Sequence, residues 1–217
     1  MLSQIQENYL KCIYKITEKK VEGASTNEIA EGLKTKAATV TDMLKKLALL
    51  NLINYQKYQA VTLTLKGKKL ALNIIRNHRL WEVFLVDKLQ FKWNEVHDVA
   101  EQMEHIKSEE LIDRLEKFLG MPNLDPHGDP IPSKTGKIIP NISKPLSEIE
   151  IGKAVEINGV NKHQDDFLQH LNELGLTIGK QVKVKKIVAF DGSMLLEMEH
   201  DKHQFVSQIV AQHILVK

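Results

Sequence analysis

The 217-residue chain has a mass of 24.8 kDa, which exceeds one minimal domain and indicates two or three structural units. Hydrophobic residues make up 42% of the chain and charged residues 27%, which excludes a disordered protein. No window of the sequence approaches the roughly eighteen consecutive apolar residues of a membrane span. The single cysteine, Cys12, excludes an internal disulfide framework and a zinc site built from thiolates, and together with the polar start MLSQIQENYLKC it indicates a cytoplasmic protein.

The net charge of +2 is unevenly distributed along the chain. Residues 1–76 carry 13 Lys and Arg against 6 Asp and Glu, residues 77–150 carry 9 against 14, and residues 151–217 carry 8 of each kind. A basic first third favours a polyanionic partner such as nucleic acid, and an acidic middle favours bound cations.

The first 65 residues have the pattern of a winged helix-turn-helix. Apolar residues recur at helical spacing over about residues 4–19. Thr26 is the expected cap of a short second helix, and a break at residues 34–37 separates that helix from a third. The run LINYQKYQAVTLT then places two β-prone segments around a polar tip, which predicts a hairpin.

Three more helices are predicted in the middle of the chain. The first covers residues 66–89, the second covers residues 93–106 with Asn94 as its cap, and the third covers residues 108–119 with Ser108 as its cap.

Proline marks the end of this helical part. All six prolines fall between Gly120 and Leu146, so this stretch is predicted to be a linker or an extended loop. The alternating runs that follow predict a small β-barrel, with one helix that ends at Gly175.

Histidines and glutamates cluster at helical spacing in the acidic middle. The window HDVAEQMEH has four of them at positions i, i+4, i+7 and i+8, and the preceding helix has two at i and i+4, so each set would lie on one helix face. Neutral imidazoles and carboxylates without a thiolate are ligands for divalent transition metals. The candidate ligands are His78, Glu82, His97, Glu101, Glu104 and His105.

The clustered histidines and glutamates are also compatible with three alternatives to a metal sensor. The residues could form a solvated helix face, or belong to a protein that buffers metal. A zinc hydrolase also uses His and Glu at i and i+4, but the chain lacks an H-E-x-x-H motif, a nucleophile elbow and a glycine-rich phosphate loop. A metal site in an acidic segment beside a basic helix-turn-helix favours sensing over catalysis.

The strings IIRNHRLWEVFL, EVHDVAEQMEH and LGMPNLDPHGDPIP, placed after a helix-turn-helix and ribbon, resemble the diphtheria-toxin-repressor family of iron- and manganese-dependent transcriptional regulators. The resemblance covers about residues 5–133, and the β domain resembles the SH3-like domain of longer members. It implies a homodimer that binds double-stranded operator DNA when its metal is present and represses metal-uptake genes, with no catalytic residues, membrane segment or small-molecule substrate.

On this basis the fold class is mainly α with a small β domain. The expected parts are a winged helix-turn-helix DNA-binding domain over residues 1–65, a helical metal-binding and dimerisation domain over 66–120, a proline-rich linker over 121–146 and an SH3-like domain over 147–217.

The resemblance also implies two metal sites in each subunit. The activating site would contain Glu101, Glu104 and His105 and be completed from the first helix by Asn8, with Glu7 as a less favoured substitute. The ancillary site would contain three residues of the helical middle. Two residues of the string KHQDDFLQ would join it from the β domain, unless they are exposed loop residues. These five residues are His78, Glu82, His97, His163 and Asp166.

The donor set favours manganese as the cofactor, with ferrous iron as the alternative. Iron-type members of the family carry Cys at the position of Glu101 and Met at that of Asn8, so oxygen donors replace both soft ligands here. Manganese-type members carry Asp at the position of Asn8, and an uncharged amide there predicts a lower affinity. His97 follows the iron-type pattern.

The third helix is expected to enter the major groove of the operator with its N-terminal residues at base edges. Residues later in this helix and on the wing are better placed for phosphates. Asp42 would repel a phosphate, so it is expected to face bases or to cap the helix. The predicted DNA-contacting residues are Lys36, Ala37, Ala38, Thr39, Thr41, Asp42, Lys45, Lys46, Lys57 and Tyr58.

Overall fold

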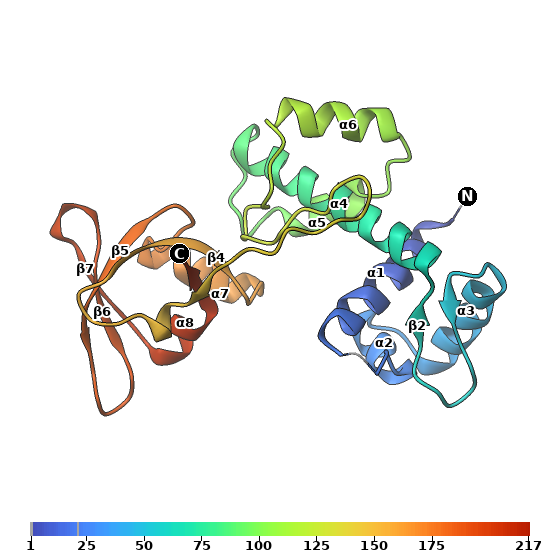
Figure 1. The fold of residues 1–217 in the computed structure, drawn as a ribbon, viewed down its shortest axis with the longest axis horizontal. Coiled ribbons are helices and arrows are strands. Elements are labelled where there is room, and N and C mark those ends of the chain that lie inside the picture. Colours follow the sequence, from blue (N-terminus) through green and yellow to red (C-terminus); the bar gives the residue numbers. More distant parts are fainter. Residues whose placement is uncertain (1, 21) are drawn as a thin grey trace. The chain divides into compact units, whose positions relative to one another are not determined.

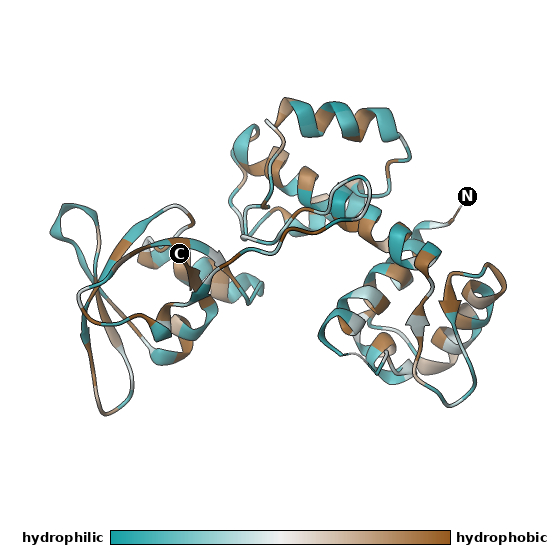
Figure 2. Cartoon of the chain, viewed as in Figure 1, coloured by the Kyte–Doolittle hydropathy of each residue, from teal (hydrophilic) through white to brown (hydrophobic). Residues whose placement is uncertain are grey.

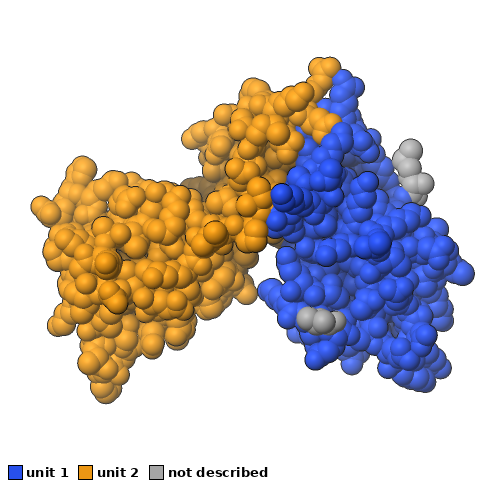
Figure 3. Space-filling model, viewed as in Figure 1, with its two compact units in different colours: residues 1–78, 101–112, 132–138 blue, residues 79–100, 113–131, 139–217 orange. Residues whose placement is uncertain are grey.

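A computed structural model describes residues 2–20 and 22–217, and the chain forms two compact units (Figures 1 and 3). The first unit comprises the residues up to 78 together with 101–112 and 132–138. The second unit comprises residues 79–100, 113–131 and 139–217.

The first unit contains the helix-turn-helix and hairpin that the sequence predicts. Its elements are α1 (Gln4–Lys19), α2 (Thr26–Gly32), α3 (Ala37–Leu49), β1 (Ile53–Asn54) and β2 (Thr62–Leu63). The two strands pair antiparallel with Ile53 opposite Leu63, which forms the base of the wing. The helices bury one apolar face each in a shared core that includes Leu10, Ile13, Ile29, Leu44 and Leu47.

Serine residues cap the first two helices. Ser3 Oγ accepts a hydrogen bond from the Gln6 amide, Ser25 Oγ accepts one from the Glu28 amide, and each cap backbone N–H donates to the side chain three residues on. The predicted cap Thr26 is therefore wrong by one residue. Ser25 forms the capping box with Glu28, so Thr26 becomes the first residue of α2.

The helices of the middle part are α4 (Leu65–Asp87), α5 (His97–Met103) and α6 (Glu109–Phe118). Hydrophilic and hydrophobic residues share each of these helices (Figure 2). Ser108 caps α6 as predicted, because its Oγ accepts a hydrogen bond from the Leu111 amide at 3.3 Å. Within residues 2–20 and 22–217, no helix combines the length and the apolar character needed to cross a membrane.

Helix α5 is shorter than the predicted helix over residues 93–106, and Asn94 does not cap it. Trp93 is buried in the core of the β domain, and its Nε1 donates to Asn172 Oδ1 at 2.6 Å. Asn94 Oδ1 accepts a hydrogen bond from the side-chain Nδ2 of Asn172 at 3.0 Å. These contacts within the second unit hold both residues outside the helix.

The proline-rich segment contains an ordered turn with its own hydrogen bonds. The Asp125 amide donates to the Asp129 carbonyl at 3.0 Å, and the Ile131 amide donates to the Asn123 carbonyl at 2.8 Å. Asp125 and His127 are buried in this turn. The segment thus places two ionisable side chains inside the second unit.

The elements of the β domain are β3 (Lys144–Pro145), η1 (Leu146–Glu148), β4 (Ala154–Val160), α7 (Asp165–Leu174), β5 (Gln181–Ile187), β6 (Met194–Glu197), η2 (Glu199–Asp201), β7 (His203–Val206), α8 (Gln208–His213) and β8 (Ile214–Val216). Its strands form a six-stranded antiparallel sheet in the order β3-β8-β4-β5-β6-β7. Gly175 ends α7 with a φ of 73°, as the sequence predicts. The core includes Leu146, Ile157, Leu171, Leu196 and Ile214.

Gly67, in the first turn of α4, lies against the backbone of Leu52, because a Cβ at this glycine would stand 1.9 Å from the Leu52 carbonyl oxygen. Alanine usually stabilises a helix by about 1 kcal/mol relative to glycine. Here we expect Gly67→Ala to lower the free energy of unfolding by about 3 kcal/mol, measured by urea denaturation. The exposed neighbour Lys68→Ala should change it by less than about 0.5 kcal/mol, and equal stability of both variants would contradict the close approach.

Candidate metal centre and DNA-contacting helix

An acidic pair and a lysine connect α1 to the end of α5 within the first unit. Lys11 Nζ lies 2.6 Å and 2.9 Å from the two carboxylate oxygens of Glu104 and 3.2 Å from Glu101 Oε1. The side chain of Glu104 is fully buried. Burial alone would raise the pKa of Glu104, but the hydrogen bond with His78 and the charge of Lys11 outweigh it and lower this pKa.

Two histidines contact the same acidic region. His78 Nδ1 lies 2.7 Å from Glu104 Oε2, and His105 Nε2 lies 3.6 Å from Glu104 Oε1. His105 Nδ1 is paired with Glu7 Oε2 at 2.6 Å. A carboxylate on one ring nitrogen of a metal-binding histidine orients the other nitrogen for coordination, and the contact between Glu7 and His105 has this arrangement.

The first helix supplies one unsatisfied oxygen. Asn8 lies on α1 in the turn before Lys11, and its Oδ1 is buried without a hydrogen-bond partner among the described residues. A buried acceptor left in this state is unfavourable unless a ligand satisfies it. Amide and carboxylate oxygens and imidazole nitrogens, the donor types of Asn8, Glu101, Glu104 and His105, are ligands that fit a hard divalent cation.

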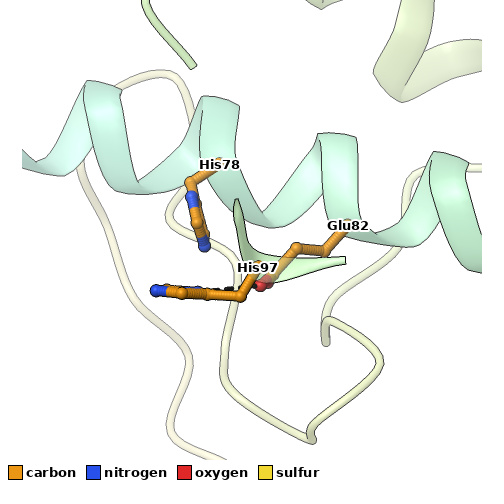
Figure 4. A group of neighbouring side chains, drawn as sticks. All are labelled: His78, Glu82 and His97. Carbon is orange, nitrogen blue, oxygen red and sulfur yellow. Dashed lines mark ion pairs between the residues drawn. The ribbon is translucent and has the colours of Figure 1, made fainter. Parts of the chain in front are cut away.

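His78, Glu82 and His97 bring one ligand atom each to within 4.8 Å of one another. His78 and Glu82 are one turn apart on α4, and Figure 4 shows both side chains projecting from the same side of the helix toward His97. His97 Nδ1 lies 3.6 Å from Glu82 Oε1, and the His97 side chain is 49% exposed. The predicted ancillary trio is therefore assembled on α4 and α5.

Glu82 also belongs to a second possible ligand group, with Asp125 and His127, again within 4.8 Å and fully buried. His127 Nδ1 lies 3.8 Å from Glu82 Oε2, and its Nε2 lies 2.8 Å from the Trp93 carbonyl oxygen. Burial, and next the charges of Glu82 and Asp129, raise the pKa of Asp125 to about 7.

Sequence reasoning did not select Asp125 and His127 as ligands. Both lie in the string LDPHGDP, which carries the family resemblance but has none of the helical spacing that marks the other candidate ligands. The available signal was an acid and a histidine two residues apart beside prolines, which hold a loop in a fixed shape. Lys11 was likewise overlooked as a partner of Glu101 and Glu104.

The two ligands expected from the β domain differ in position. His163 is exposed, with its Nε2 3.8 Å from Asp129 Oδ2 and its ring at 5.4 Å from that of His127, edge to face. Asp166 is exposed, and its Oδ1 accepts a hydrogen bond from the Phe167 amide. His163 therefore lies beside the group that contains His127, whereas the Asp166 carboxylate is engaged by the next residue of its own helix.

The face of α3 predicted to contact DNA is exposed. Of the ten predicted residues, Thr41 is half-buried, with its hydroxyl donating to the Ala37 carbonyl, and the other nine are exposed. Asp42 neither caps the helix nor lacks a partner, because its Oδ1 pairs with Lys45 Nζ at 3.1 Å. On the wing, Lys57 Nζ lies 4.9 Å from the ring centre of Tyr58, whose exposed fraction is 92%.

Family models match three consecutive parts of the chain. They are "Iron dependent repressor, N-terminal DNA binding domain" over residues 1–61, "Iron dependent repressor, metal binding and dimerisation domain" over residues 64–133 and "FeoA domain" over residues 144–217.

Individual proteins match over most of their length. The iron-dependent repressor IdeR of Mycobacterium tuberculosis is 31% identical over 192 residues, which cover 82% of this chain and 83% of that protein. A solved structure of a manganese-dependent transcriptional repressor in complex with manganese is 32% identical, with a TM-score of 0.84 and coverage of 98% of this chain and 99% of the other. The structure of the manganese regulator SloR is also 32% identical, with a TM-score of 0.69 and coverage of 98% and 97%.

Proposed function

The chain belongs to the iron-dependent repressor family of metal-dependent, DNA-binding transcriptional repressors, which are not enzymes, and on that premise we propose that it is a manganese-responsive repressor. It would act in the cytoplasm as a homodimer on double-stranded operator DNA and control metal uptake. One observation carries the proposal most strongly. Side chains of α1, the first helix of the DNA-binding domain, contact Glu104 and His105, so the candidate ligands of the activating site and the DNA-binding helices share one unit.

We propose that Asn8, Glu101, Glu104 and His105 hold the activating metal. Support comes from the unsatisfied Asn8 Oδ1, from the burial of Glu104 and from the contact between Glu7 and His105. A divalent cation supplies positive charge that oxygen and nitrogen donors from separate segments can share. The chain's own contribution is to join α1 to the segment after α5 through these side chains.

We propose a second metal position at Glu82, which faces two ligand groups. His78 and His97 are its partners on one side, and Asp125 and His127 are its partners on the other. His163 beside His127 is the candidate from the β domain, and Asp166, whose Oδ1 already accepts a hydrogen bond from the Phe167 amide, is a weaker one.

Manganese is proposed over iron because the ligands are hard. Carboxylate and amide oxygens outnumber imidazoles in the activating set, and the single cysteine, Cys12, is not among the candidate ligands. Ferrous iron remains the alternative of the same family, supported by the histidine at position 97 and by relatives named as iron-dependent repressors.

The proposed DNA contacts follow from the exposed end of α3. The small side chains of Ala37, Ala38 and Thr39 suit thymine methyl groups, and the exposed lysines at positions 45, 46 and 57 suit phosphates. Because Asp42 is paired with Lys45, its charge is partly neutralised on the DNA-facing side. Apolar residues that a second copy could cover support the homodimer, namely Leu89, Leu111 and Phe118.

The test is DNA binding with and without metal. Duplexes enriched from a randomised pool in the presence of Mn²⁺ should be shifted in a gel by Mn²⁺-loaded protein, and chelator should remove the shift. Apo protein that binds these duplexes as tightly as loaded protein would contradict the proposal. The shift should also weaken steeply with added salt, because lysine–phosphate contacts release counterions.

A further inference from the structure

Lys11 is the buried cation of the activating region. The residue is 6% exposed on α1, and its ammonium contacts both oxygens of Glu104 and one of Glu101. Lysine is rarely buried unless it is paired, and here two carboxylates provide the pairing. The ammonium therefore has a specific place inside the first unit, unlike the exposed lysines of the same helix at positions 15 and 19.

The ion pair with Lys11 compensates the buried charge of Glu104. A fully buried carboxylate is strongly unfavourable without a compensating charge. Lys11 supplies this charge at 2.6 Å, and Glu101 adds a second, half-exposed carboxylate at 3.2 Å. The lowered pKa of Glu104 agrees with a stable ion pair in this geometry.

The same carboxylates are the proposed ligands of the activating metal, so this inference rests on the proposed function. An ammonium has three hydrogen-bond donors and no acceptor, so it cannot coordinate a cation. It would also repel a divalent ion placed a few ångströms away, strongly so in a partly buried site. The ammonium and a metal ion therefore cannot share the oxygens of Glu104.

We propose that Lys11 is a built-in counter-ion that occupies the acidic pair of Glu101 and Glu104 when metal is scarce, and that metal enters the activating site by displacing it. The exchange keeps Glu104 neutralised in both states. It also raises the metal concentration needed for activation, because each binding event has to break the ion pair with Lys11. Lys11 is thus a residue that sets the metal threshold, although it is not a ligand.

The experiment compares wild type with Lys11→Met in the full chain, using Lys19→Met as the control that removes an exposed charge from the same helix. Mn²⁺ affinity is measured by calorimetry on chelator-treated protein. We expect Lys11→Met to bind Mn²⁺ roughly tenfold more tightly or better, because a like charge near the site is gone. Adding Glu104→Gln to Lys11→Met should remove the gain, which would locate it at this site.

Thermal unfolding with chelator gives a readout that does not depend on metal. Lys11→Met leaves Glu104 buried without its cation, so its melting temperature should fall by roughly 5 °C or more below that of wild type, and added Mn²⁺ should restore most of the loss. Lys19→Met should melt like wild type. If Lys11→Met does not fold, Lys11→Gln, whose amide can still donate to Glu104, takes its place in both measurements.

The outcomes separate this inference from the proposed function. Unchanged or weaker Mn²⁺ binding by the Lys11 variant, an equal gain in Lys19→Met, or a chelator-treated Lys11 variant as stable as wild type would each overturn the counter-ion role. Failure of Mn²⁺ to promote DNA binding by wild type would instead overturn the proposed function, and the melting experiment would still report on the ion pair.

Discussion

Replacing Glu104 by glutamine is expected to abolish metal-dependent DNA binding. The side chain of Glu104 is fully buried, and it contacts Lys11, His78 and His105 at once. Glutamine keeps the shape but removes the charge that both the ammonium and a divalent cation require. We expect the Mn²⁺-dependent affinity for enriched DNA to fall by about a hundredfold or more, measured by fluorescence anisotropy at fixed salt.

Two further variants test whether the effect of Glu104→Gln is specific to the activating site. Glu109→Gln removes a carboxylate that is 86% exposed in the first turn of α6, and it should bind DNA like wild type. His97→Ala removes a half-exposed ligand of the proposed second position and should weaken activation partially. Equal effects of Glu104→Gln and His97→Ala would show that the proposed division between activating and ancillary sites is wrong.

The structure changes how a His78 variant should behave. The sequence places His78 with Glu82 and His97 alone, but its Nδ1 also contacts Glu104 at 2.7 Å. A variant at His78 would therefore disturb both proposed sites. Sequence spacing along one helix cannot reveal this contact, because Glu104 reaches His78 from another segment.

The elements of the fold with strong local signals were predictable from sequence. The helix over residues 4–19 and the end of the β-domain helix at Gly175 follow from periodicity and from a glycine with positive φ. The helix predicted over residues 93–106 was wrong at both ends. At its start, Trp93 and Asn94 are held by Asn172, about eighty residues away, and tertiary contacts of this kind leave no local pattern.

The geometry of the candidate site also depends on tertiary contacts that leave no local pattern in the sequence. The predicted face with four ligands on one helix is wrong in its geometry, because α5 ends at Met103 and leaves Glu104 and His105 in the turn that follows. They still meet the first helix, since the turn directs them toward Glu7 and Lys11. Residue types and the approximate location of the site were thus accessible from sequence, whereas the ion pair with Lys11 required the fold.

Exchanging Glu101 for cysteine is expected to shift the metal response from manganese toward ferrous iron. Glu101 is a half-exposed carboxylate that shares Lys11 with Glu104, and iron-type members of the family resemble this chain but carry Cys at its position. A thiolate is a softer donor than a carboxylate and binds Fe²⁺ more strongly than Mn²⁺, because affinity for soft ligands rises along the first-row series.

The measurement compares Mn²⁺ with anaerobic Fe²⁺ at matched free concentrations in the DNA-binding assay. Wild type should reach half-maximal binding at a lower concentration of Mn²⁺ than of Fe²⁺, and Glu101→Cys should reverse the order, a relative shift of roughly tenfold or more. Glu101→Gln serves as the matched control, because it loses the charge but keeps an oxygen donor, and it should weaken both responses without reversing them. A wild type that responds to Fe²⁺ alone would overturn the manganese proposal, because the hard oxygen donors of Asn8 and Glu101 would then not determine which ion activates the protein.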